Sequence, residues 1–274
     1  MLEQLKYQNH LNEVYEFGKD GIFVKTNDLH DYEWAVTQRG NRIAAIDYAV
    51  SKRKLPITII CSTEEEGIRA RNRLMEVTEK DVLAMKHGRI IIGDYYFRCF
   101  VTKSEKKQSQ WSRRHMEVTL TLISDFPYWV KESTHIFRKL GEGSGGKNLD
   151  HSHDLPYDYF SGMGNKKLNN AAFVATNFRM TIYGACTCPV VYIAGHAYQV
   201  ECEVGVGEHL TIDSIKKTIT LTAVDGTVTN VFNLRNRDSY IFEKIPPGQN
   251  SVIWSGNYGV DVTLLEERSE PKWT

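Results

Sequence analysis

Residues 207–222 have the sequence GEHLTIDSIKKTITLT, and this stretch sets the fold of the C-terminal part of the chain. It holds two short runs of β-branched and apolar residues that are separated by a polar turn. Similar runs recur outward from it at intervals of roughly eight to twelve residues, with turn pairs such as Asp225-Gly226 between them. The predicted strands are 179–183, 190–193, 198–203, 210–213, 218–222, 251–255 and 260–265. Because no long helix interrupts this spacing, we predict an antiparallel β-sandwich over 170–274.

The first 131 residues predict a second β-rich domain with one helix. Thr63 or Ser62 can cap that helix with Glu65 or Glu66 as the reciprocal partner, and we expect it to span about 63–79. Residues at helical spacing should face a sheet: Ile68, Ala70, Leu74, Met75 and Val77. A hairpin follows, with strands 89–92 and 95–101 joined by Gly93-Asp94. We therefore expect a β-sandwich or barrel with one packed helix and a long hairpin.

Between these two domains, the character of the sequence changes. Residues 139–169 are polar and rich in glycine, with no apolar period. Such a composition is typical of a linker. We therefore divide the chain into an N-terminal domain (1–131), a linker with an extended arm (132–169) and a C-terminal domain (170–274).

The bulk composition limits the possible functions. The 274 residues include 34 basic and 34 acidic side chains, and residues 1–131 hold 21 basic against 18 acidic, an excess too weak for a DNA-binding domain. Apolar residues make up 41% of the chain, so wholesale disorder is excluded. No apolar run is long enough for a transmembrane helix, and the charged first residues do not fit a signal peptide. We expect a protein that folds in a cytoplasm, docks to other proteins and has no membrane segment.

The five cysteines do not predict a metal site. Cys186 and Cys188 lie two residues apart, which places them on one face of a strand, but there is no CxxC pair. We expect all five to be buried thiols that act as small hydrophobic groups: Cys61, Cys99, Cys186, Cys188 and Cys202. No metal and no other cofactor is expected.

Seven pieces of the last hundred residues occur in an order that resembles a known family. They begin with MTIYG (180–184), continue through GEHLTID (207–213), DGTVTN (225–230) and PPG (246–248), and finish with ERSEPKW (267–273). This order resembles the C-terminal domain of phage distal tail proteins, the siphovirus tail-component family. The DFPYW ending of the N-terminal part (125–129) is similar to the usual exit from that family's other domain.

The resemblance implies a structural protein without catalytic activity. It implies a tail-tube-like N-terminal domain that forms a ring of six copies, and a galectin-like C-terminal sandwich outside the ring. The ring would lie at the tail tip of a virion assembled in the bacterial host cytoplasm, and DNA would pass through its lumen at ejection. The implied partners are the major tail protein of the tube, the tape measure protein, the tail-associated fibre or lysin protein, and a receptor-binding protein.

Edge strands and hairpins suit a ring contact, because an unpaired sheet edge already exposes hydrogen-bond donors and acceptors. We therefore place the subunit contact on the 89–101 hairpin and on the basic stretch 103–115. The residues predicted for it are Arg89, Ile91, Tyr95, Tyr96, Lys106, Lys107, Trp111, Arg113 and Arg114. The alternative is that 103–115 is a solvated loop.

Two other classes of function remain as alternatives. His151, His153 and Asp154 are metal-ligand types within the linker, and 141–146, GEGSGG, lacks the Lys-Ser/Thr ending of a phosphate-binding loop. The C-terminal sandwich could instead be a carbohydrate-binding host-adhesion module that uses Trp254, Tyr258 and Tyr240 as a platform. Against this, Trp254 is flanked by apolar residues in a predicted strand, where it would fill the core.

Overall fold

The computed structural model describes residues 4–25, 28–106, 114–140 and 164–272. The chain divides into two compact units, unit 1 (Met1–Lys131 with Glu267–Thr274) and unit 2 (Glu132–Glu266). Both are built from antiparallel strands, and the described residues contain one α-helix. This agrees with the mainly β fold predicted from the sequence.

Unit 1 is a set of strands around one core. Its strands are β1 (Leu5–Gln8), β2 (Val14–Glu16), β3 (Ile22–Val24), β4 (Ala35–Arg39), β5 (Arg42–Asp47), β6 (Ser51–Ile60), β7 (Gly88–Ile92), β8 (Tyr95–Lys106), β9 (His115–Ser124) and the start of β10 (Trp129–Phe137). The twelve-residue β8 joins the sheet together. Its first half pairs with β7 on one edge and with β10 on the other, and its second half pairs with β9.

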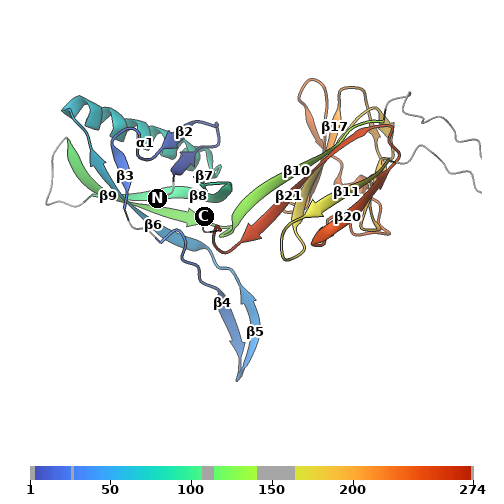
Figure 1. The fold of residues 1–274 in the computed structure, drawn as a ribbon, viewed down its shortest axis with the longest axis horizontal. Helices are drawn as coiled ribbons and strands as arrows, with labels where there is room; N and C mark the ends of the chain where they lie inside the picture. Colours follow the sequence, from blue (N-terminus) through green and yellow to red (C-terminus); the bar gives the residue numbers. More distant parts are fainter. Residues whose placement is uncertain (1–3, 26–27, 107–113, 141–163, 273–274) are drawn as a thin grey trace, which may run out of the picture. The chain divides into compact units, whose positions relative to one another are not determined.

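Helix α1 (Glu64–Ala84) covers this sheet (Figure 1). Thr63 caps it as predicted, since its hydroxyl accepts the backbone N–H of Glu66 while the Glu66 carboxylate accepts that of Thr63. The helix is longer than predicted and ends at Met85, which adopts a left-handed conformation. Its buried stripe is Gly67, Ala70, Leu74, Val77, Thr78 and Asp81. Ile68 and Met75, expected to face the sheet, are exposed instead, because they lie to one side of that stripe.

Strand β6 spans ten residues and has Pro56 in its interior. Pro56 lies opposite Thr119 of β9, but its carbonyl accepts a hydrogen bond from Lys25, which follows β3 on the other edge of β6. In an antiparallel strand, the N and O atoms of one residue point to the same edge. The missing N–H of Pro56 therefore faces the end of β3 and removes no hydrogen bond from the β6–β9 ladder.

Unit 2 is an antiparallel β-sandwich, as predicted. Its strands are the end of β10, β11 (Gly164–Asn170), β12 (Asn177–Tyr183), β13 (Cys186–Thr187), β14 (Val190–Ile193), β15 (His196–Gln199), β16 (Glu203–Val204), β17 (His209–Asp213), β18 (Thr218–Thr222), β19 (Val228–Asn230), β20 (Gly248–Trp254) and β21 (Gly259–Arg268), with a 3₁₀ turn at Phe232–Leu234. One sheet has the order β19-β18-β17-β12-β21-β10 and the other has the order β11-β20-β14-β15. A core that includes Phe178, Tyr198 and Trp254 fills the unit.

Two strands extend into the segment 132–169 that the sequence assigned to the linker. Residues 132–137 continue β10, and β11 begins at Gly164, whereas 141–163 lie outside the described residues. Residues 267–274 belong to unit 1 rather than to the sandwich. Their position depends on contacts with residues far away in the sequence, which a local pattern does not encode. The boundaries 1–131, 132–169 and 170–274 stay a prediction about which segments fold independently.

Candidate interaction surfaces

The β4–β5 hairpin, which we call the arm (residues 34–48), projects from unit 1 (Figure 1). Gly40 and Asn41 form its two-residue turn, and Gly40 has a φ of 62°, a left-handed conformation that glycine adopts without a steric penalty. Among the described strands, β4 and β5 pair only with each other. An isolated two-stranded hairpin is marginally stable in water, so this arm needs further contacts.

The two faces of the arm differ in character. Val36 lies opposite Ile46, and Gln38 lies opposite Ile43 beyond a β-bulge. Since side chains alternate between faces along a strand, these residues share one face with Trp34 and Tyr48. The side chains of Val36, Ile43 and Ile46 are 49%, 62% and 52% exposed. The arm therefore carries a mostly apolar face that the described residues of unit 1 leave exposed.

Aromatic contacts hold the base of the arm in place. The ring of Tyr48 lies 4.0 Å from that of Trp34 and 4.5 Å from that of Tyr128, between ring centroids. The Tyr48 hydroxyl also forms a hydrogen bond with the hydroxyl of Ser269, in the C-terminal segment of unit 1. Burial raises the pKa of Tyr48. The arm is therefore fixed at its base while its tip is exposed.

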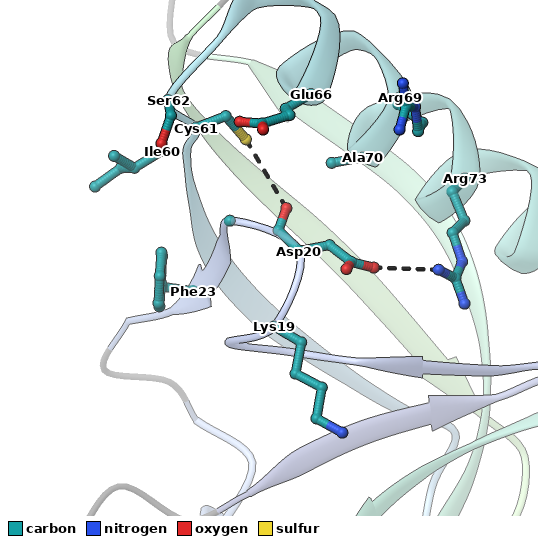
Figure 2. Close-up of a pocket in the computed structure, with 11 residues that line it drawn as sticks. Lys19, Asp20, Phe23, Ile60, Cys61, Ser62, Glu66, Arg69, Ala70 and Arg73 are labelled. Atoms are coloured by element: carbon teal, nitrogen blue, oxygen red, sulfur yellow. Dashed lines mark hydrogen bonds and ion pairs between the residues drawn. The ribbon is translucent and has the colours of Figure 1, made fainter.

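A groove of about 460 Å³ opens where β3, the end of β6 and the start of α1 meet (Figure 2). Phe23 and Ile60 supply its apolar part, and Lys19, Arg69 and Arg73 supply positive charge. The residues that complete the lining are Asp20, Gly21, Cys61, Ser62, Glu66 and Ala70. A side chain at Gly21 would bring a Cβ within 2.5 Å of the Cys61 sulfur and of the Ile60 carbonyl oxygen, so only glycine fits this wall of the groove.

The one thiol that lines the groove is not activated as a nucleophile. This thiol, Cys61, has a pKa raised by burial and by the nearby Glu66 carboxylate, so it stays protonated at neutral pH and is a weak nucleophile. Asp20 forms an ion pair with Arg73, with 3.3 Å between the carboxylate oxygen and the guanidinium nitrogen. The charges of Asp20 and Arg73 are therefore engaged with each other at the wall of the groove.

The predicted contact residues fall into two places. Arg89, Ile91 and Tyr96 lie on the outer face of the β7–β8 hairpin, with the Arg89 guanidinium 4.8 Å from the centre of the Tyr96 ring. Tyr95 faces the other way and is buried in the core of unit 1. Its side chain is therefore occupied by packing within the subunit.

The remaining predicted residues lie at the far end of β8. Lys106 and Arg114 are exposed at the tip of the β8–β9 hairpin, whereas Lys107, Trp111 and Arg113 lie outside the described residues. Arg98 is the register partner of Arg89. Lys106 lies eight positions after Arg98 on the same strand, which corresponds to about 26 Å. A single compact patch therefore does not hold both groups.

The alternative sites find little support. Among the described residues, no group of three or more His, Cys, Asp or Glu side chains could hold a metal ion, and the His151–Asp154 cluster and the 141–146 loop lie outside them. Trp254 and Tyr258 are buried, and the Trp254 indole N–H donates to the Tyr258 carbonyl. Only Tyr240 of the proposed sugar platform is exposed. No helix in the described part of the chain is long and apolar enough to cross a membrane.

Sequence comparisons and structure comparisons give different results. No family model and no curated protein matches the sequence. One match is the crystal structure of the SPP1 Dit protein (gp 19.1), described as a paradigm of the hub adsorption apparatus in phages that infect Gram-positive bacteria. It has a TM-score of 0.60 and 9% identity, over 98% of this chain and 100% of that chain. A chain of the phage P2 baseplate in its activated conformation matches with a TM-score of 0.63 with Ca and 0.62 with Sr, each at 12% identity over 99% of this chain and 100% of that chain.

The chain has the fold of phage hub and baseplate proteins. This confirms the mainly β, hub-like fold that the family resemblance implied. Unit 1 of this chain includes an arm that the sequence analysis did not single out as a contact. The pattern was present in the alternation of 34–48 around Gly40-Asn41, but alternation alone does not tell which face a protein leaves uncovered.

Proposed function

We propose that this chain is a structural hub subunit at the tip of a phage tail and catalyses no reaction. The match in fold to a hub protein and to baseplate chains along almost the whole chain carries this proposal. The proposed location is the virion, after assembly in the cytoplasm of a bacterial host.

In this proposal, six copies form a closed ring through unit 1. A ring requires two different surfaces on each subunit, because each copy contacts one neighbour on each side. The apolar face of the arm supplies one of them, since it is exposed in the single chain and would be buried against the next copy. The second surface includes the outer face of the β7–β8 hairpin, with Arg89, Ile91 and Tyr96.

The ring would connect the tail tube to the proteins at the tip. Its proposed partners are the major tail protein and the tape measure protein on one side, and the tail-associated fibre or lysin protein and a receptor-binding protein on the other. DNA would pass through the lumen without sequence-specific contacts, which agrees with the net charge of zero. The galectin-like character of unit 2 remains part of this proposal. A role of unit 2 as a carbohydrate-binding module is not favoured, because two of its three candidate aromatic residues are buried.

The ring is tested by the mass and the shape of the purified full-length protein. Sedimentation velocity over a wide range of concentrations should show a species of six times the 31.4 kDa chain mass. Negative-stain electron microscopy of that species should show six-fold rings with a central hole. A single chain at every concentration, or a closed dimer without a hole, would contradict the proposal.

A further inference from the structure

Three of the five cysteines gather at one end of the unit 2 sandwich. Cys186 opens β13, Cys188 directly follows β13, and Cys202 directly precedes β16. In the β13–β16 ladder, Cys186 lies opposite Val204 and Thr187 lies opposite Glu203. One further step in the same register places Cys188 opposite Cys202. The backbone agrees, because the N–H of Cys188 donates to the carbonyl of Cys202 at 2.9 Å.

This arrangement fits the geometry of a disulfide. Residues that face each other across a hydrogen-bonded antiparallel pair have Cα atoms about 5.5 Å apart. Disulfides join residues whose Cα atoms are roughly 4.4–6.8 Å apart. Cys188 has a φ of 47° and an exposed side chain, so its thiol leaves the regular alternation of the ladder, whereas Cys202 packs in the core of unit 2. The backbone hydrogen bond keeps the two residues adjacent, and the Cys188 thiol must turn from solvent toward Cys202 for the two sulfur atoms to join.

The three thiols differ in their access to solvent. All are free cysteines; Cys188 is exposed, Cys186 is half-buried and Cys202 is buried. Burial, and then the neighbouring Cys188, raises the pKa of the Cys202 thiol. Burial, and then Cys202, raises the pKa of Cys186 to about 11. Cys188 is therefore the thiol that an oxidant in solution reaches first, and Cys202 is its nearest partner along the ladder.

We propose that Cys188 and Cys202 form an oxidisable pair that closes to a disulfide by exchange with a small-molecule disulfide. The Cys188 thiolate attacks the small disulfide, forms a mixed disulfide and releases one small thiol. The Cys202 sulfur then gives up its proton, attacks the Cys188 sulfur and releases the second small thiol. Two protein thiols are oxidised by two electrons, and one small disulfide is reduced to two thiols.

The bond would join the two connections that cross between the sheets at this end. Residues 184–189 lead from β12 to β14, and residues 200–208 lead from β15 to β17. Strands β12 and β17 pair in one sheet, whereas β14 and β15 pair in the other. A disulfide between residues 188 and 202 therefore closes a loop that contains β14 and β15, and it restricts the unfolded chain.

The time at which the bond forms rests on the proposed function, whereas its chemistry does not. A hub protein is folded in a reducing cytoplasm and leaves it when the particles are released. The pair would stay reduced during assembly and would close afterwards. Oxidation would then stabilise unit 2 in the free particle.

The test uses the folded full-length protein in a buffer of reduced and oxidised glutathione. Alkylation after denaturation, followed by mass spectrometry, should show that two of five thiols are lost, and peptide mapping should link residues 188 and 202. The melting temperature of unit 2 should rise by about 5 °C. Cys186→Ser is the matched control, because it removes a neighbouring thiol and should leave this bond intact.

Two further variants separate the steps. Cys188→Ser should prevent the loss of two thiols. Cys202→Ser should leave glutathione attached to Cys188, because the thiol that resolves the mixed disulfide is missing. The proposal is overturned if all five thiols survive oxidation, or if Cys186→Ser prevents the bond while Cys188→Ser does not. Neither result depends on ring formation, so this proposal and the hub function fail separately.

Discussion

At the scale of single residues, Asp81 is the centre of a buried polar cluster in unit 1. Its side chain is fully buried, and it accepts the Tyr7 hydroxyl at 2.5 Å and the backbone N–H of His10 at 2.8 Å. The Nδ1 atom of His10 lies 2.6 Å from Oδ1 of Asp81, the oxygen that also accepts the His10 backbone N–H. A Cβ at Gly88 would collide with both Asp81 and Tyr7, so glycine leaves the space for this cluster. These contacts tie α1 to the N-terminal strand and its turn.

Replacing Asp81 should therefore destabilise unit 1. Asp81→Ala leaves the Tyr7 hydroxyl and the His10 N–H without their acceptor and should lower the free energy of unfolding by about 3–5 kcal/mol. Asp81→Asn should cost less, because the amide oxygen still accepts one hydrogen bond. The measurement is urea unfolding of unit 1. Glu79→Ala, at an exposed position of the same helix, should change stability by no more than about 0.5 kcal/mol. Equal losses for Asp81→Ala and Glu79→Ala would refute the role assigned to this cluster.

At the scale of elements, the helix and the arm illustrate two sources of stability. Helix α1 has a capping box at Thr63 and a buried stripe, so local sequence and tertiary packing favour the same structure. The arm has the alternation of an amphipathic hairpin, but in the single chain its apolar face remains in water. An element of this kind is completed by a neighbour, and in the proposed ring that neighbour is a second copy.

The two faces of the arm allow a matched test of this assignment. Val36→Asp with Ile46→Lys places an ion pair on the apolar face, and Thr37→Asp with Ala45→Lys places the same pair on the other face. In both variants the new charges lie directly opposite each other, so strand pairing is preserved. The first variant should weaken assembly by about tenfold or more, which corresponds to about 1.4 kcal/mol. The second should assemble like the original protein in sedimentation experiments. Equal effects of the two variants would exclude the apolar face as the contact.

At the scale of the whole molecule, the chain passes between the two units twice, at residues 131–132 and 266–267. Residues 267–272 thus stabilise a unit whose other residues all come from the first half of the chain. Ser269 bonds to Tyr48, and Pro271 is buried. The integrity of unit 1 therefore depends on a segment that is synthesised after unit 2.

Removal of residues 267–274 should loosen unit 1 and leave unit 2 intact. Hydrogen exchange followed by mass spectrometry should show faster exchange around Tyr48 and Tyr128 and unchanged protection in the core strands of unit 2. Ser269→Ala, which removes one hydrogen bond, should produce a smaller version of the same change. Loss of protection in unit 2 with unit 1 unaffected would mean that the segment acts elsewhere.

The sequence alone was sufficient for features that depend on neighbours along the chain. The capping residues before α1, the Gly93-Asp94 turn and the regular strand spacing after residue 170 each act over a few residues, so the helix, the hairpin and the sandwich could be predicted. Only the tertiary structure decided which faces are covered. Ile68 was predicted to face the sheet but is exposed, and Tyr95 was predicted to lie at the subunit contact but is buried. The uncovered face of the arm, the juxtaposition of Cys188 with Cys202 and the return of residues 267–274 to unit 1 also came from the tertiary structure. Burial and contact are determined by segments that are distant in sequence, and a local pattern carries no record of them.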